Sequence, residues 1–203
     1  MQLLPEKALY LIQHKILLLA DLHFGKVNHF RKAGIAVPAK ANKKNAETLI
    51  DLIQRTKPER IIFLGDLFHS HYNEDWEVIG QIRKHFAHLS FELVIGNHDI
   101  MSEQQYKRHS LQLHQKELKA GNFLLTHEVV DELHDGLYNL SGHMHPGVRL
   151  RGMAKQSMML PCFYFGKSHG ILPAFGSFTG LAKITPKRNE KVFVIAEGKI
   201  VEV

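Results

Sequence analysis

The sequence predicts an α/β or mixed-sheet fold that gathers its functional side chains at one edge of a sheet. Short apolar runs alternate with polar, helix-like stretches, and five of the apolar runs end directly in motifs rich in Asp, Asn or His. Hydrophobic residues make up 44% of the 203 residues and charged residues 23%, which is typical of a globular chain. This length suits one hydrophobic core, so we expect residues 1–203 to form a single domain.

Periodicity and turn residues predict the individual elements. Residues 38–56 and 75–86 each place apolar side chains at spacings of three and four, as amphipathic helices do, and Pro58 follows the first of them. Ser102 is a candidate N-cap for a short third helix. Apolar runs bounded by turn residues predict two strand pairs and a further strand: residues 8–12 with 15–20, residues 192–196 with 199–203, and residues 91–95.

The five apolar runs that end in candidate ligands are the informative feature. In α/β sheets, ligands collect outside the carboxyl ends of the strands, so neighbouring strand ends would bring these groups into one pocket. The segments directly after the runs are Asp21-Leu22-His23, Gly65-Asp66, Gly96-Asn97-His98-Asp99, Thr126-His127 and Ser141-Gly142-His143-Met144-His145.

The side chains collected in this way suit divalent metal ions. They offer oxygen and nitrogen donors and no thiolate, which favours Mn²⁺, Fe, Zn²⁺ or Co²⁺. The set is too large for one tetrahedral zinc but sufficient for two ions that share a carboxylate. Two ions about 3.5–4 Å apart can bind a phosphate and generate a hydroxide at neutral pH. The candidate ligands are Asp21, His23, Asp66, Asn97, His127, His143 and His145.

The order and spacing of these motifs resemble the calcineurin-like metallophosphoesterase superfamily. This resemblance implies a four-layer α-β-β-α sandwich with two mixed sheets. It also implies that Asp66 bridges two ions and that His98 is the general acid beside them. In that scheme the ligands of the first ion are Asp21, His23, Asp66 and His145, and those of the second are Asp66, Asn97, His127 and His143. Thr126 departs from the family, in which Gly often precedes the histidine, and we expect it to be tolerated if the strand continues to His127.

A narrower resemblance covers nearly the whole chain. The segments Ala20-Asp21-Leu22-His23-Phe24-Gly25-Lys26, Phe30-Arg31-x-x-Gly34-Ile35 and Leu172-Pro173-Ala174-Phe175-Gly176-Ser177 are similar to the ligase-associated DNA damage response metallophosphoesterases. This similarity implies a Mn²⁺-dependent phosphodiesterase with DNA endonuclease activity in DNA repair. It also implies a functional association with an ATP-dependent DNA ligase and a helicase.

The second motif separates this chain from the protein phosphatases of the superfamily. Those enzymes carry Gly-Asp-x-x-Asp-Arg-Gly, whereas this sequence has His69 and Ser70 in place of the Asp and the Arg. Without that Arg, we expect phosphodiesters to be preferred to phosphomonoesters. His69 would orient His98 or shuttle its proton; the alternative is that His69 packs at the metal loop without touching the chemistry.

Basic side chains next to the first motif are candidate substrate ligands. Lys26 and Arg31 would bind phosphate oxygens at the mouth of the pocket, and the alternative is a solvated basic loop. The net charge of +6 permits an anionic partner such as DNA. Two other functions stay open: a phosphodiesterase or pyrophosphatase for small nucleotides or lipid head groups, and a scaffold without catalysis.

The remaining composition bears on compartment and on the other histidines. Cys162 is the single cysteine, so we expect no intramolecular disulfide, an inert buried thiol and a cytoplasmic protein. No apolar run is long enough to predict a membrane-spanning helix. Six of the 15 histidines are assigned to the surface: His14, His85, His88, His109, His114 and His134.

Overall fold

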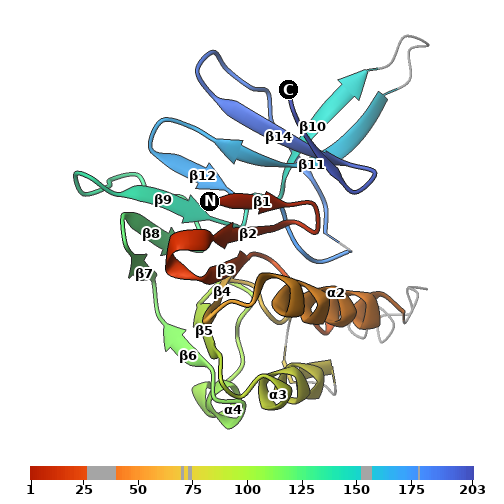
Figure 1. Ribbon diagram of the computed structural model, residues 1–203, viewed down its shortest axis with the longest axis vertical. Helices are drawn as coiled ribbons and strands as arrows, with labels where there is room; N and C mark the ends of the chain where they lie inside the picture. The colour runs from red at the N-terminus through yellow and green to blue at the C-terminus, as the bar shows by residue number, and fades with distance from the viewer. Residues whose placement is uncertain (27–39, 70, 73–74, 152–156, 178) are drawn as a thin grey trace.

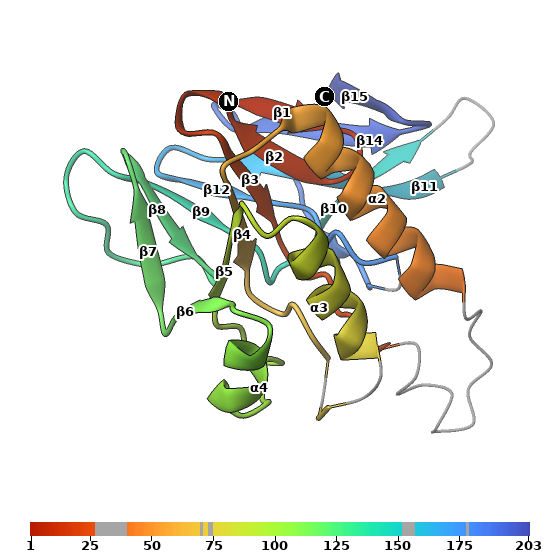
Figure 2. The ribbon, with the colours of Figure 1, turned by 60° about the horizontal axis from the view of Figure 1, so that its bottom comes forward.

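The computed structural model describes residues 1–26, 40–69, 71–72, 75–151, 157–177 and 179–203, with only the backbone described for 40–42 and 151. Two β-sheets pack face to face, and the α-helices cover the outer face of the first sheet (Figures 1 and 2). The expected α/β fold with two mixed sheets is therefore confirmed. No helix of the described residues is long and apolar enough to cross a membrane.

The first sheet has six strands in the order of the chain. β2 is antiparallel to both of its neighbours, β1 and β3, and the strands from β3 to β6 are parallel. The parallel strands β3, β4 and β5 therefore present their carboxyl ends at one edge, where the first three motifs begin. The strands are β1 (Gln2–Leu4), β2 (Ala8–Leu11), β3 (Ile16–Leu19), β4 (Arg60–Leu64), β5 (Ser90–Val94) and β6 (Gln112–His114).

The second sheet has nine strands, in the order β13-β10-β11-β12-β9-β8-β7, with β14 paired to β11 and β15 paired to β14. β8, β9 and β12 are mutually parallel, so the last two motifs begin at adjacent carboxyl ends. The strands are β7 (Glu117–Ala120), β8 (Phe123–Thr126), β9 (Tyr138–Ser141), β10 (Pro146–Arg151), β11 (Ser157–Phe165), β12 (His169–Ile171), β13 (Ala182–Lys183), β14 (Lys191–Ala196) and β15 (Lys199–Glu202).

The helices match the expected segments closely. α2 (Lys40–Thr56) and α3 (Asp75–His85) lie side by side on the first sheet, and α4 (Glu103–Arg108) follows β5 with Ser102 as its N-cap (Figure 2). The Gln105 side chain accepts a hydrogen bond from the Ser102 backbone N–H at 3.3 Å, as in a capping box. A 3₁₀ turn, η1 (Ile12–His14), connects β2 to β3. Each predicted strand is also present, with bounds that differ by one or two residues.

Two apolar layers hold the sandwich together. Alternate residues of β3 and β4 face opposite sides: Leu17 and Ile61 pack under the helices, whereas Leu18 and Ile62 pack against the second sheet. The outer face of the second sheet carries a third apolar cluster that includes Val148, Cys162 and Val194. In the described residues, this outer layer is formed by strand and loop side chains rather than by a helix.

Cys162 is fully buried, and burial raises the pKa of its thiol to about 12, so the expectation of an inert buried thiol is confirmed. The surface assignment is confirmed for four of the six histidines, namely His14, His85, His88 and His134. It is wrong for two. The His109 ring lies against Trp76 at 5.4 Å between centroids, and the His114 Nε2 lies 3.0 Å from a carboxylate oxygen of buried Glu92.

Candidate metal centre

Backbone hydrogen bonds continue between the loops after the strands have ended. The N–H groups of Asp21, His23 and Phe24 donate to the carbonyl oxygens of Gly65, Asp66 and Leu67, at 3.2, 2.9 and 3.0 Å. The His143 N–H donates to the Asp21 Oδ2 atom at 2.9 Å, which ties the second sheet to the first. These bonds hold the first, second and fifth strand-end motifs together.

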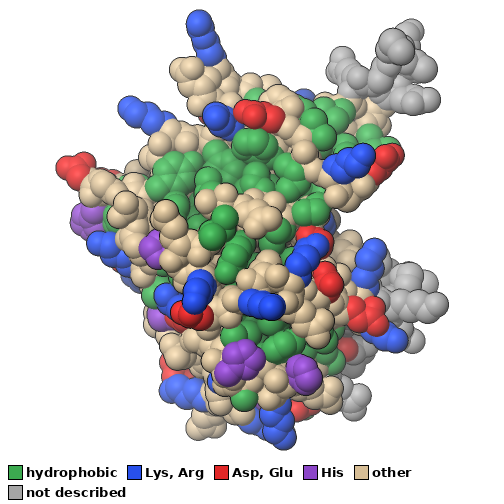
Figure 3. All heavy atoms as spheres, in the orientation of Figure 1, with side chains coloured by type: hydrophobic (Ala, Val, Ile, Leu, Met, Phe, Trp, Pro, Cys, Tyr) green, Lys and Arg blue, Asp and Glu red, His purple; other side chains and the backbone are tan. Residues whose placement is uncertain are grey.

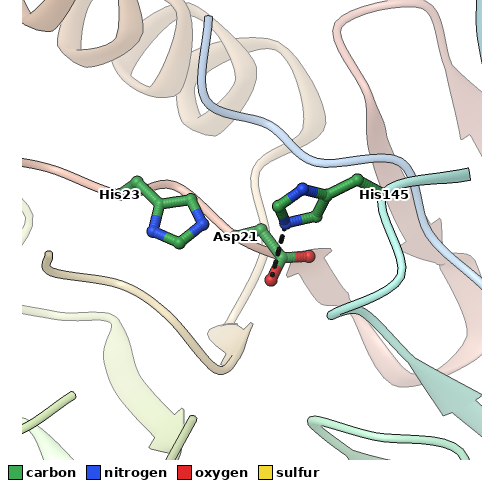
Figure 4. A group of neighbouring side chains, drawn as sticks. All are labelled: Asp21, His23 and His145. Carbon is green, nitrogen blue, oxygen red and sulfur yellow. Dashed lines mark ion pairs between the residues drawn. The ribbon is translucent and has the colours of Figure 1, made fainter. Parts of the chain in front are cut away.

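The first cluster consists of Asp21, His23 and His145, whose candidate ligand atoms lie within 4.8 Å of one another. Asp21 and His23 are buried, and His145 is partly buried. The His145 Nε2 lies 3.4 Å from the Asp21 Oδ1, and the His23 ring faces the same space (Figure 4). Burial lowers the pKa of His23 to about 2, helped by Lys26 and the neighbouring histidines, so this imidazole is neutral. A neutral imidazole is the form that binds metals.

The second cluster consists of Asp66, His127 and His143, together with Asn97. The His127 Nδ1 lies 3.0 Å from the Leu64 carbonyl oxygen, which fixes the proton on Nδ1 when the ring is neutral. The Nε2 lone pair then faces the Asn97 Oδ1 at 2.9 Å and the Asp66 Oδ1 at 3.5 Å. The His143 Nδ1 lies 3.1 Å from the same Nε2.

Asp66 lies between the two clusters. Its Oδ2 is 3.7 Å from the His23 Nε2, and its Oδ1 is 3.5 Å from the His127 Nε2. The His98 backbone N–H donates to the Oδ1 at 2.9 Å and fixes the carboxylate. Of the described acidic residues, Asp66 is the one whose two oxygens reach histidines of both clusters.

The backbone around the clusters is conformationally strained. Asp21, His23, Asp66, His143 and His145 all have φ between 46° and 65°, a left-handed region that L residues rarely adopt. Gly65 also has positive φ, and a Cβ there would lie 2.0 Å from the His127 Nδ1. Only glycine therefore allows the approach of His127 to this turn. Such strain concentrates at functional sites.

The chemistry of the two clusters fits divalent cations. In the first cluster, the Asp21 Oδ1, the His145 Nε2 and both ring nitrogens of His23 are buried without a hydrogen-bond partner among the described residues. In the second cluster, neutral His127 carries its proton on Nδ1, so its Nε2 is an acceptor. This nitrogen faces two further acceptors, the Asn97 Oδ1 and the Asp66 Oδ1. A positive ion satisfies both arrangements, because it binds buried lone pairs that no donor reaches. The seven predicted ligands are thus brought together, and they could hold two ions.

His98 and His69 lie next to each other beside the first cluster. Their ring centroids are 4.5 Å apart, and each ring is 5.4 Å from that of His23. Neither residue belongs to the two clusters of candidate ligands. The structure therefore places His69 against His98, as the sequence comparison with the phosphatases anticipated. Ser70 lies outside the described residues.

Asp99 connects the second and third motif loops, a role that the sequence did not reveal. Its Oδ1 accepts a hydrogen bond from the Phe68 N–H at 3.1 Å, and its Oδ2 accepts one from the Gly96 N–H at 2.9 Å. Burial raises the pKa of Asp99 to about 7, against the effect of these two hydrogen bonds. The feature of the sequence that could have indicated this role is the position of Asp99 at the end of the Gly-Asn-His-Asp motif.

The basic side chains predicted to bind substrate are only partly described. Burial lowers the pKa of Lys26, whereas the negative charges of Asp66 and Asp21 act in the opposite direction. Arg31 lies outside the described residues. On the face shown in Figure 3, Lys and Arg side chains stand apart from one another and are interspersed with acidic groups, rather than forming one basic stripe.

A groove of about 510 Å³ runs from the second cluster, with Asn97 and His127 in its wall. Its other walls include Ile95, Val129 and Val130, and its charged groups are Lys116, Glu117 and Glu128. The Glu128 Oε1 lies 3.8 Å from the His143 Nε2, the nitrogen that points away from the cluster. This contact between neighbouring loops was not predicted.

Comparison with known proteins identifies the family. The model of the calcineurin-like phosphoesterases matches residues 14–159, which includes every strand-end motif. The chain belongs to the calcineurin-like phosphoesterase family. It is therefore a hydrolase of phosphoesters, and the broader resemblance drawn from the motifs is confirmed. Among proteins of curated function, none matches this chain.

Solved structures of phosphoesterases are also similar. The nuclease MPE of Pseudomonas putida is 28% identical, with 98% of this chain and 93% of that chain covered and a TM-score of 0.83. The phosphoesterase Yfce of E. coli is 13% identical, with 93% and 97% covered and a TM-score of 0.48. The similarity to the nuclease covers nearly the whole of this chain. It agrees with the resemblance to the DNA damage response metallophosphoesterases that the motifs indicated.

Proposed function

We propose that this phosphoesterase is a metal-dependent phosphodiesterase that cleaves DNA as an endonuclease in DNA repair. The observation that carries the proposal is the position of Asp66 between two clusters of candidate ligands, the first of which has buried ligand atoms without a hydrogen-bond partner among the described residues. The 28% identity to a nuclease over 98% of the chain supports the nucleic-acid substrate. Acting on DNA would place the protein in the cytoplasm, beside the DNA ligase and helicase of the predicted association.

In this proposal, Asp21, His23 and His145 would hold one divalent ion, Asn97, His127 and His143 would hold another, and Asp66 would be shared between them. Two Mn²⁺ ions held there would neutralise phosphate charge and lower the pKa of a water molecule for attack on phosphorus. The strained loops fix these side chains before substrate arrives, which lowers the cost of reorganisation during the reaction.

His98 provides the proton for the leaving oxygen. Its backbone N–H is anchored to Asp66, so its side chain projects beside the group that bridges the clusters. An alkoxide is a poor leaving group, and a positioned acid contributes roughly 10²–10⁴-fold to such a step. In this proposal the His69 ring, whose centroid lies 4.5 Å from that of His98, limits the orientations of the His98 ring.

The decisive experiment uses a panel of linear and circular, single- and double-stranded DNA incubated with Mn²⁺. Cleavage of circular single strands would establish endonuclease action, because a circle offers no end to an exonuclease. Hydrolysis of bis-p-nitrophenyl phosphate without cleavage of any DNA would contradict the nuclease assignment and favour a small phosphodiester substrate. Hydrolysis of neither would support a scaffold.

The sequence at His69 and Ser70 adds a substrate test. A monoester dianion presents more negative charge than a diester, and the Arg that phosphatases use against it is replaced by Ser70. We therefore expect faster hydrolysis of bis-p-nitrophenyl phosphate than of p-nitrophenyl phosphate. A clear preference for the monoester would move the chain to the phosphatase class.

A further inference from the structure

A small pocket lies beside the first cluster, between the β1–β2 turn, α2 and the segment after β12. It has a volume of about 260 Å³, and its polar lining includes Lys7, Lys44, Asn45, Thr48 and Ser177. The β1–β2 turn and α2 lie next to each other in both ribbon views (Figures 1 and 2). We call this feature the Lys7–Lys44 pocket. Its volume of about 260 Å³ is sufficient for a phosphate group.

The pocket borders the backbone of the metal centre. β2 pairs with β3 so that Leu9 faces Leu18, and Lys7 lies in the turn directly before β2. On the other side, the Phe175 N–H donates to the Ala20 carbonyl oxygen at 2.8 Å, and the Gly176 N–H donates to that of Asp21 at 3.1 Å. Ser177 is the next residue. Both walls of the pocket are thus attached to the strand end that carries the first cluster.

The charge in the pocket is positive and is not neutralised internally. Neither Lys7 nor Lys44 forms an ion pair with any described residue. Glu6 also lines the pocket and its Oε1 is 2.7 Å from the Arg55 Nη2, so the two lysines and one carboxylate of the lining leave an excess of positive charge. Burial lowers the pKa of Lys7, and Lys44 adds to this effect by repulsion. An anion between the two ammonium groups would relieve that repulsion.

The groove on the side of the second cluster is less suited to an anion. Its charged groups are one lysine, Lys116, and two carboxylates, Glu117 and Glu128. Of these two spaces beside the metal centre, the Lys7–Lys44 pocket is the one with excess positive charge. A flanking phosphate is therefore favoured on the side of Asp21 and His23.

We propose that the Lys7–Lys44 pocket binds a backbone phosphate of the DNA strand that flanks the phosphodiester being cleaved. The inference rests on the proposed function, because DNA is the substrate that repeats a phosphate at each nucleotide. Lys7 and Lys44 supply the charge, and the Ser177 hydroxyl donates to the Asn45 Oδ1 at 2.7 Å, which fixes the Asn45 amide at the wall as a further polar group. The pocket would position the strand and take no part in the chemical step.

The test compares a double variant, Lys7→Gln with Lys44→Gln, with a matched control that removes two exposed lysines elsewhere, Lys119→Gln with Lys199→Gln. Both variants change the net charge equally. We expect the pocket variant to raise KM for single-stranded DNA about tenfold, the usual cost of a lost charge-assisted contact. The slope of log K against log salt should become shallower by about 0.7, as one phosphate contact is lost. The control should do neither.

Turnover of bis-p-nitrophenyl phosphate should stay unchanged in the pocket variant, because this substrate has no second phosphate. Lys44→Gln alone, on an exposed helix position, tests the pocket if Lys7→Gln impairs folding. Equal effects of the pocket and control variants on DNA, or equal losses on DNA and the bis ester, would overturn the pocket while leaving the nuclease function intact. Wild-type protein that hydrolyses the bis ester but neither binds nor cleaves DNA would overturn the proposed function itself.

Discussion

The two candidate ligand clusters differ in how their side chains are held. In the second cluster, His127 is fixed by the Leu64 carbonyl, and the side chains of Asn97 and His143 lie within 3.1 Å of its other nitrogen. In the first cluster, His23 has neither ring nitrogen bonded, and the His145 Nε2 is likewise buried without a hydrogen-bond partner among the described residues.

This difference indicates different contributions of a metal ion at the two places. An unpartnered buried polar atom costs about 1–3 kcal/mol, and a bound cation removes that cost. A bound ion would therefore stabilise the first cluster more than the second, whose side chains are already held by protein contacts. Asp66 contacts both clusters, so its substitution should affect metal binding at both of them.

The largest effect is expected for Asp66→Ala. Loss of the shared carboxylate should impair both ions, and a deficit of several kcal/mol corresponds to a decrease in turnover of about 10³-fold or more. The measurements are Mn²⁺-dependent hydrolysis of bis-p-nitrophenyl phosphate and elemental analysis, which should approach two ions per wild-type chain.

Asp21→Ala should spare the second ion more than the first, and Asp51→Ala, on the exposed side of α2, should leave activity and metal content unchanged. Retention of one full-affinity ion in Asp66→Ala would show that the clusters are independent. A wild-type stoichiometry that saturates at one ion in excess Mn²⁺ would count against the dinuclear interpretation.

His98→Ala should reduce DNA cleavage about 10²-fold while both ions stay bound, because in the proposed mechanism His98 donates a proton and is not a ligand. The loss should be much smaller on bis-p-nitrophenyl phosphate, since p-nitrophenolate leaves without protonation. If His98→Ala released metal, or slowed both substrates equally, the general-acid assignment would be wrong.

Mn²⁺ at about a hundred times its Kd should add about 2.7 kcal/mol, which raises the Tm by roughly 5–10 °C for a chain of this size. His145→Ala should abolish a larger part of this increase than His143→Ala, because the His145 Nε2 is one of the buried unpartnered atoms. Differential scanning calorimetry with and without a chelator measures both shifts. Equal losses in the two variants would remove the distinction between the clusters.

The smallest catalytic effect is expected for His69→Ala, which should decrease the rate of DNA cleavage about tenfold. The effect is small because, in the proposal, His69 orients the acid and does not itself supply the proton. The pattern over leaving groups should match that of His98→Ala, with a smaller amplitude. The exposed neighbour His71→Ala is the control. An unchanged rate on DNA would support the alternative that His69 only packs at the loop.

The sequence was informative where chain order alone decides which residues become neighbours. Parallel strands place their carboxyl ends at one edge, so Asp21, Asp66 and Asn97 could be grouped because each comes directly after an apolar run. Thr126 was expected to be tolerated at the end of a continuing strand. It ends β8, and its hydroxyl accepts a hydrogen bond from the Asn139 amide at 2.8 Å.

The sequence was less informative where packing between distant elements decides. His109 was assigned to the surface by residue type, but Gly80 on α3 leaves room for its ring, since a Cβ there would lie 2.3 Å from the His109 Cε1. Likewise, Lys7 meets Lys44 only because the β1–β2 turn packs on α2.

The left-handed backbone of the five candidate ligand residues has a consequence for local unfolding. A non-glycine residue in this conformation costs about 1–2 kcal/mol, and here the cost is met by the packing of the two sheets around the loops. The loops therefore open more readily than the strands that lead into them, and their amide hydrogens should exchange with solvent sooner. A core substitution that loosens the contact between the sheets would first weaken metal affinity, well before the protein as a whole unfolds.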